Sequence, residues 1–271
     1  HFWRLSIVDE NRGNQPFKKN NVVIFFNGEI YNYKYLKYLY LQNDNFKSFS
    51  DTEVILNLYL KFCTKCFDLL EGMFSIVIID ERLNKLILAR DVTGVKPLYY
   101  SIKNKMINFS SEIKGINHYF NEGQLDKKSL LRYQLFQTPY NYKTLYKGIN
   151  KLSPGQILKF DLSNIEKFSK NLIKINIAKF RNENEYIFAL SKVMNETLEN
   201  SFDINQKKSF HLSGGLDSNL ILSKFFQNNN ENIKVVTSIL ENDRDEELIN
   251  AEKTKKILKI KNYSNIKINR K

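Results

Sequence analysis

Apolar positions along this chain fall into short blocks of strand or single-helix length, separated by polar turns. Residues 1–9 and 22–26 have the apolar character of buried strands. A helix is predicted from about residue 32 to 42, because apolar residues recur there at spacings of three and four.

The tripeptide Asn27-Gly28-Glu29 stands between the second strand and this helix. Asn-Gly after an apolar run is the usual signal for a two-residue hairpin turn. The residues that follow have helical rather than strand spacing, as Ile30, Tyr33 and Leu36 show. We therefore predict that the strand stops at this tripeptide and that the chain turns there into a helix.

Further elements follow with clear start signals. Ser50 and Glu53 form a capping box, which predicts a helix beginning at Ser50. Two hairpins are predicted next, "MFSIVIID" with "KLILARD" and "PLYYSI" with "MINFSSE". A short helix, "DKKSLLRYQLF", and a strand after the turn "LSPG" complete this hairpin-rich part.

The pattern changes beyond about residue 165. The stretch "NIEKFSKNLIKINIAKFRNENE" has no clear period and is interpreted as a linker or an edge segment. From Glu185 onward helices and strands alternate, which is typical of a doubly wound parallel sheet. We predict a hairpin-rich antiparallel domain in residues 1–180 and the start of an α/β domain in residues 181–271.

Composition narrows the class of protein. With 271 residues, 42% of them hydrophobic, the chain has room for about two domains with real cores. No apolar run approaches the roughly 20 residues of a membrane span, and no signal peptide opens the chain, so a cytoplasmic protein without a membrane partner is expected. The net charge of +13 comes from lysines spread along the whole length, which argues against a nucleic-acid-binding patch.

Cys63 and Cys66 form a C-x-x-C pair. Such a pair can be a redox motif or half of a zinc site. Zinc needs four ligands, and the three histidines of the chain lack ligand spacing. Because the pair ends a helical pattern, we favour two small apolar residues that bind no metal.

The stretch "FHLSGGLDSNLIL" places Ser213-Gly214-Gly215-Leu216-Asp217-Ser218 between a predicted strand and a predicted helix. Glycines there let the backbone approach a ligand, and the helix N-terminus offers N–H groups to an anion. Asp217 could hold a metal that bridges phosphates, or it could simply cap the helix. The context favours a phosphate-binding turn over a plain connection, although no lysine of a Walker loop follows.

"SGGLDS" resembles the pyrophosphate-binding loop of the ATP pyrophosphatases. The wider chain is similar to one branch of them, the glutamine-hydrolysing asparagine synthetases. The resemblance rests on an ordered series of blocks along nearly the whole chain: "RLSIVD", "NGEIYN", "SDTEVIL", "EGMFSIVIID", "ARDVTGVKPLYY", "SSEIKGI", "LSPG", "LSGGLDS" and "DEELINAEKTKKIL".

This resemblance implies that the first domain is a class II glutamine amidotransferase with the αββα sandwich of the N-terminal-nucleophile hydrolases. Asn27 and the Gly28 N–H would stabilise the oxyanion, at about 3–4 kcal/mol per donor. Arg4 would bind the α-carboxylate of glutamine, Glu29 and Asp51 would lie around its ammonium, and Asn27 would also contact the bound glutamine. Taken alone, Arg4 could be a surface residue and Asp51 a partner of the helix dipole.

The resemblance also implies an ATP site in an α/β domain of the pyrophosphatase type. The residues that match the family's loop and adenine pocket are Leu212, Ser213, Gly214, Gly215, Asp217, Ser218 and Ile239. Asp217 would share Mg²⁺ with the phosphates. Glutamine, aspartate and ATP are then the expected small-molecule partners, with a homodimer as the family's possible assembly.

The implied reaction uses glutamine-derived ammonia to amidate ATP-activated aspartate, giving asparagine, glutamate, AMP and pyrophosphate. There are two alternatives: the enzyme amidates another carboxylate, or the protein is a non-catalytic paralogue that binds glutamine or ATP. The family's nucleophile is an N-terminal cysteine, whereas this sequence starts with His1 and ends inside a predicted strand. We therefore expect a chain cut at both ends, without glutaminase activity by itself.

Overall fold

The computed structural model describes residues 14–120, 124–163, 167–172, 178–201, 209–228, 233–240 and 246–268. The chain divides into two compact units, residues 1–176 and residues 177–271, which are treated separately below. The division falls after residue 176, whereas the boundary predicted from the sequence lies after residue 180.

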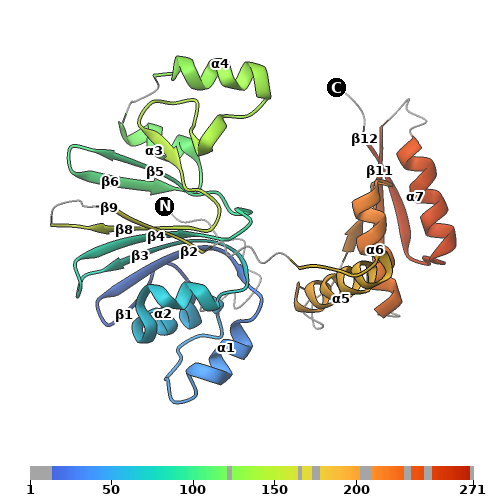
Figure 1. Ribbon diagram of the computed structural model, residues 1–271, viewed down its shortest axis with the longest axis horizontal. Coiled ribbons are helices and arrows are strands. Elements are labelled where there is room, and N and C mark those ends of the chain that lie inside the picture. Colours follow the sequence, from blue (N-terminus) through green and yellow to red (C-terminus); the bar gives the residue numbers. More distant parts are fainter. Residues whose placement is uncertain are drawn as a thin grey trace. The chain divides into compact units, whose positions relative to one another are not determined.

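Unit 1 contains two antiparallel sheets (Figure 1). The larger one has the strand order β1-β2-β3-β4-β8-β9, with the bounds β1 Phe17–Lys19, β2 Val22–Ile30, β3 Gly72–Asp80, β4 Lys85–Arg90, β8 Gln156–Asp161 and β9 Lys167–Asn171. The smaller one has the order β6-β5-β7, with the bounds β5 Tyr99–Lys103, β6 Met106–Ser110 and β7 Ile149–Lys151. Both predicted hairpins, β3 with β4 and β5 with β6, are confirmed.

Helices cover both outer faces of this pair of sheets (Figure 1). On the larger sheet lie α1 (Tyr33–Tyr40), α2 (Asp51–Phe62) and the 3-10 helix η1 (Cys63–Leu69). On the smaller sheet packs α3 (Ile113–Phe120), and α4 (Lys127–Phe136) and η2 (Tyr140–Tyr142) follow it in the chain. The predicted αββα sandwich is confirmed.

Two apolar cores hold these layers together. Ile24 and Ile76 of the larger sheet pack with Ile55 of α2 in the first core. Leu88 and Phe160 of the same sheet pack in the second core with residues of the smaller sheet. Each fully buried side chain of this size contributes about 1.5–3 kcal/mol, so the two cores fix the spacing of the layers.

The prediction of a strand that stops before Asn27 is wrong. Strand β2 continues to Ile30, and α1 begins only at Tyr33. The pairing with β3 continues through the tripeptide, with Gly28 opposite Phe74 and Ile30 opposite Gly72. The sequence concealed this continuation because it depends on β3, a strand more than forty residues away in the chain.

The predicted N-cap of α2 is confirmed, but the reciprocal bond of a capping box is not formed, because the Ser50 N–H donates to Ser48 Oγ at 3.3 Å and not to Glu53. Ser50 Oγ accepts a hydrogen bond from the Glu53 N–H at 3.3 Å. The Glu53 carboxylate reaches further back and accepts from the N–H groups of Lys47 and Ser48 at 2.7 to 3.0 Å. These bonds satisfy groups at the helix N-terminus and anchor the loop before it.

Unit 2 contains a parallel sheet with the order β10-β11-β12, with the bounds β10 Ser209–His211, β11 Lys234–Leu240 and β12 Tyr263–Ile268. The helices α5 (Glu183–Ser201), α6 (Leu216–Asn228) and α7 (Glu246–Ile257) alternate with these strands. Leu212, Leu222, Val235 and Ala251 form its apolar core. The predicted alternation of helices with parallel strands is confirmed.

Candidate functional site

Asn27 lies on the face of β2 that looks toward the smaller sheet. Its neighbour on this face, Phe25, meets Phe109 of β6 with ring centroids 5.5 Å apart. Asn27 Nδ2 donates to Ser111 Oγ at 3.3 Å. Both residues line a cavity of about 930 Å³, and pockets for small ligands have about 300–1,000 Å³. The Asn27 amide is thus a polar group at the wall of a space large enough for an amino acid.

The Gly28 N–H points away from β3. Hydrogen bonds alternate along an antiparallel strand, so residues 26, 28 and 30 direct their N–H groups to the same side. On that side the Phe26 N–H donates to Gln15 Oε1 at 2.6 Å, and the Ile30 N–H donates to Asp51 Oδ2 at 3.2 Å. The Gly28 N–H therefore lies between two bonded positions of the strand.

Only glycine fits at this position. Gly28 has φ of +149°, and a Cβ built on it would lie 2.0 Å from the Met73 carbonyl oxygen. Such a contact cannot be relieved by a rotamer change, because the neighbouring atom belongs to the backbone of the paired strand. The close approach of β2 and β3 thus accounts for the glycine in the motif.

Acidic side chains gather at the carboxyl end of β2. Asp51 is 2% exposed and bonds to the strand at Ile30. Glu29 is the preceding strand residue, and the pKa of Tyr31 is raised by burial and by the negative charges of Glu29 and Asp91. This end of the strand therefore has a negative potential, which suits an ammonium group. Asn27, Gly28 and Glu29 are consecutive in β2, and Asp51 bonds to the end of that strand at Ile30, whereas Arg4 lies outside the described residues.

The block "ARDVTGVKPLYY" forms a rigid connection between the two sheets. The Asp91 carboxylate accepts from the N–H groups of Val95 at 2.8 Å, Lys96 at 3.0 Å and Phe74 at 3.2 Å. Arg90 donates to backbone carbonyls, among them Lys96 at 2.7 Å, and burial lowers the pKa of its guanidinium. Because Phe74 is the residue opposite Gly28, Asp91 supports the site from behind. Sequence reasoning assigned this residue no role.

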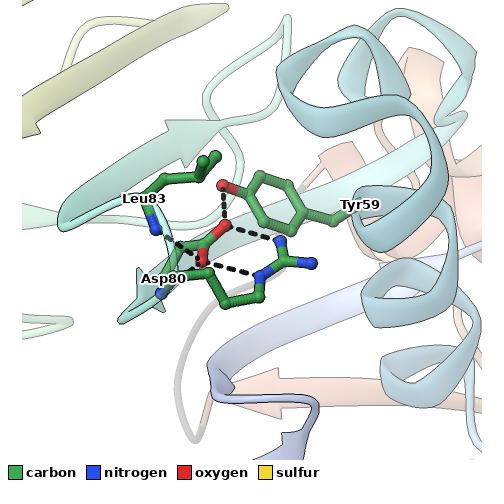
Figure 2. A network of polar contacts seen from close by, with 4 residues as sticks. Tyr59, Asp80 and Leu83 are labelled. Carbon is green, nitrogen blue, oxygen red and sulfur yellow. Dashed lines mark hydrogen bonds and ion pairs between the residues drawn. The ribbon is translucent and has the colours of Figure 1, made fainter.

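A second polar network lies at the opposite end of β3, around Asp80 (Figure 2). Its carboxylate accepts from the Tyr59 hydroxyl at 3.1 Å and from Arg82 Nε at 2.9 Å and Nη2 at 2.7 Å. Burial by itself would raise the pKa of Asp80, but the hydrogen bonds from Arg82 and Tyr59 outweigh it and hold the pKa below its usual value. Burial and the Asp80 charge raise the pKa of Tyr59. Both groups are fixed in one protonation state at neutral pH.

In unit 2 the residues of "SGGLDS" form the turn between β10 and α6. The hydroxyl oxygens of Ser213 and Ser218 are 2.9 Å apart, and the Gly215 N–H donates to Ser213 Oγ at 3.3 Å. Gly214 has φ of +88°, a conformation that glycine adopts without strain. These bonds hold two hydroxyl groups and the first turn of a helix together at the carboxyl end of a parallel strand, where α/β proteins bind ligands.

The other predicted ATP-site residues lie around this turn in different environments. Asp217 is exposed in the first turn of α6. Ile239 is half-buried in β11. The side chain of Leu212 is fully buried in the core of unit 2. The structure thus collects the loop residues at one place and turns the Leu212 side chain away from solvent.

A side-chain relay that sequence reasoning missed supports the same turn. Asn219 Nδ2 donates to the Gly214 carbonyl at 2.9 Å, and Thr254 Oγ1 of α7 donates to Asn219 Oδ1 at 2.8 Å. Thr254 is 35 residues away in the chain, so no local pattern could have indicated the contact.

The C-x-x-C pair does not form a disulfide. Cys63 is exposed and Cys66 is buried, and burial raises the pKa of the Cys66 thiol. Within the described part of the chain, no group of three or more His, Cys, Asp or Glu side chains is arranged to hold a metal ion. The same residues include no helix long and apolar enough to cross a membrane.

The model of a family described as "Glutamine amidotransferase domain" matches residues 1–170. This match covers unit 1 almost completely, including the strand with Asn27 and the helix with Asp51. The chain belongs to the glutamine amidotransferase family.

Relatives of the chain include named synthetases. Asparagine synthetase [glutamine-hydrolyzing] 1 of Bacillus subtilis is 33% identical over 229 residues, which are 82% of this chain and 36% of the relative. The amidase chry2 of Gibberella zeae is 29% identical over 80% of this chain and 33% of its own length. The chain thus spans about a third of the length of these relatives.

Among solved structures, glutamine phosphoribosylpyrophosphate amidotransferase from B. subtilis matches with a TM-score of 0.41 and 15% identity. The match covers 83% of this chain and 57% of that one. The chain thus contains a glutamine amidotransferase domain and is similar in sequence to a glutamine-hydrolysing asparagine synthetase.

Proposed function

We propose that the protein to which this chain belongs hydrolyses glutamine at unit 1 and uses the ammonia to make asparagine from ATP-activated aspartate. One observation carries the proposal: in a glutamine amidotransferase domain, Asn27 lines a cavity of amino-acid size and Asp51 bonds to the end of the same strand at Ile30. The similarity to asparagine synthetase 1 of Bacillus subtilis, which extends beyond unit 1, supports the choice of reaction.

The chemistry of amide hydrolysis accounts for these residues. Attack on the side-chain amide of glutamine creates a tetrahedral oxyanion, which preorganised N–H donors stabilise. The Asn27 amide at the cavity wall and the Gly28 N–H on the neighbouring residue would supply these donors. Glu29 and Asp51 would hold the α-ammonium, and Arg4 would hold the α-carboxylate through a bidentate pair.

Unit 2 would bind ATP at the turn that begins α6. The N-terminus of that helix and the hydroxyl groups of Ser213 and Ser218 suit the pyrophosphate group. Asp217 is exposed in the first turn, so its carboxylate is available to Mg²⁺, which proteins often bind through one or two carboxylates plus substrate phosphates. The bound ion would neutralise phosphate charge during adenylation. Ile239 and the backbone near Leu212 would border the adenine.

A second acceptor is supported by a specific observation. The amidase chry2 matches 80% of this chain at 29% identity. A protein with another name and this degree of similarity indicates that the same two units can occur with a different reaction. An amidation of a carboxylate other than aspartate is therefore the alternative function, with the two proposed half-sites unchanged.

The separation of the two sites gives the test. In the protein expressed from its natural gene, we expect Asp217→Ala to abolish aspartate-dependent pyrophosphate release. Glutamate release from glutamine should stay within about twofold of wild type, since Asp217 lies in unit 2 and the proposed glutamine site lies in unit 1. Glu246→Ala, which removes an exposed carboxylate in the first turn of α7 of the same unit, is the control variant and should leave both activities within about twofold.

Three results of this experiment would contradict the proposal. Equal loss of both activities would show that Asp217 has a folding role. Pyrophosphate release with another carboxylate but not with aspartate would establish the alternative acceptor. The absence of both activities in the wild-type protein would indicate a non-catalytic paralogue.

A further inference from the structure

The side chain of Gln15 hydrogen-bonds to β2 as a neighbouring strand would, beside the proposed oxyanion donors. Strand β1 pairs with β2 at Lys19 opposite Val22 and at Phe17 opposite Ile24. The next pair in this register would be residue 15 opposite residue 26. There the side chain of Gln15 takes the place of a backbone: Phe26 N–H donates to Oε1 at 2.6 Å, and Nε2 donates to the Phe26 carbonyl at 2.9 Å.

The orientation of this amide is fixed by its partners. Because the Phe26 N–H can only donate, the atom that faces it must be the oxygen of Gln15. The nitrogen then faces the Phe26 carbonyl and, at 3.4 Å, Thr52 Oγ1. A primary amide matches the donor and acceptor of a peptide group, so Gln15 extends the ladder by one pair.

These contacts join the two elements that carry the proposed glutamine site. Phe26 precedes Asn27 and Gly28 in β2, and Thr52 follows Asp51 in the first turn of α2. Thr52 is fully buried, and Gln15 itself lines the cavity into which Asn27 faces. One side chain therefore bonds both to the strand, next to Asn27, and to the first turn of the helix, next to Asp51.

We propose that Gln15 is a positioning residue for glutamine hydrolysis: its amide fixes the Phe26 peptide and thereby the placement of Asn27 and the Gly28 N–H. This inference rests on the proposed glutaminase function. Oxyanion donors act mainly in the transition state, so a displaced strand lowers kcat more than it raises KM. A displacement of the order of 1 Å can cost about 100-fold in rate.

The test uses the protein expressed from its natural gene, with glutamate release as the measured activity. Gln15→Met keeps the length of the side chain and removes both hydrogen-bonding groups. We expect kcat to fall by about 10- to 100-fold with KM within about threefold of wild type. Tyr59→Phe, which removes the hydroxyl bond to Asp80 at the other end of β3, is the matched control and should lower thermal stability with kcat unchanged.

A second variant gives a readout that a purely structural role would not produce. In Gln15→Glu the carboxylate still accepts from the Phe26 N–H, but it faces the Phe26 carbonyl without a proton. Protonation restores the donor, so the ratio of its kcat to that of wild type should rise as the pH falls. The corresponding ratio for Gln15→Met should stay constant, and the Glu variant keeps the test available if the Met variant does not fold.

The outcomes separate this inference from the function on which it rests. Active wild-type protein with a kcat for Gln15→Met within twofold would overturn the positioning role and leave the proposed function standing. A pH-independent ratio for a folded Gln15→Glu variant would do the same. Wild-type protein without glutaminase activity would overturn both.

Discussion

The two ends of the β2–β3 strand pair use polar groups in opposite ways. At one end, the Asp80 carboxylate accepts hydrogen bonds from other groups of the protein: the Tyr59 hydroxyl, the Arg82 guanidinium and the backbone N–H groups of the following turn (Figure 2). At the other end, Asn27 faces a cavity and the Gly28 N–H points to the side of the strand. A closed network stabilises a fold, whereas a polar side chain at a cavity wall, such as the Asn27 amide, suits a ligand.

The comparison explains why two buried acids of the same domain receive different roles. Asp80 is fully buried and has a cationic partner in Arg82. Asp51 is almost as buried and accepts a hydrogen bond from the Ile30 N–H at the other end of the strand pair, near Glu29. The contrast predicts that substitutions at the Asp80 end change stability and that substitutions at the Asp51 end change glutamine binding.

The largest effect is expected for Gly28→Ala. The added Cβ would meet the Met73 carbonyl oxygen at 2.0 Å, and φ of +149° is strained for any other residue. We expect a loss of about 3 kcal/mol or more in the free energy of unfolding, from clash and backbone strain together. Urea denaturation of unit 1 measures it.

Gly155→Ala is the matched control for that variant, because Gly155 also has a positive φ, of +63°. The backbone cost alone should be about 1–2 kcal/mol there. If Gly28→Ala is no more destabilising than Gly155→Ala, the close approach of β2 and β3 is not what requires the glycine.

A smaller effect is expected at the Asp80 end. Asp80→Asn leaves Arg82 and the Tyr59 hydroxyl with a weaker acceptor, which should cost about 2 kcal/mol at pH 7. The folded-state pKa of Asp80 lies below its usual value, so its contribution is complete above the unfolded-state pKa and is lost as the pH falls through the folded-state pKa. Wild type should therefore lose its advantage over Asp80→Asn in acid, as unfolding at a series of pH values measures. An advantage that is constant down to pH 2 would contradict this account.

The sequence predicted those features whose causes are local. The N-cap Ser50 of α2, the two hairpins and the turn before α6 each depend on residues within a few positions of one another. The continuation of β2 through Asn27-Gly28-Glu29 could not be predicted in this way, because β3 supplies the partner. For the residues of the edge strand β9 the sequence predicted either a linker or an edge segment. It could not decide between them, because the pairing of β9 with β8 depends on the rest of the sheet.

The residues of the candidate site also differ in whether the sequence could indicate them. The resemblance to the asparagine synthetases indicated Asn27, Gly28, Glu29 and Asp51. The supporting residues Gln15 and Asp91 were missed, because each acts on a backbone group 11 to 17 residues away, across the sheet. Their roles follow from the register of the strands and not from any local pattern.

The central claim is that the end of β2 binds glutamine, and calorimetric titration of the 271-residue chain with glutamine tests it most directly. We predict saturable binding of L-glutamine, a loss of affinity of about 10- to 100-fold in Asp51→Asn, and unchanged affinity in Asp80→Asn. Equal affinity of wild type and Asp51→Asn, or equal loss in both variants, would contradict the assignment of a binding end and a structural end.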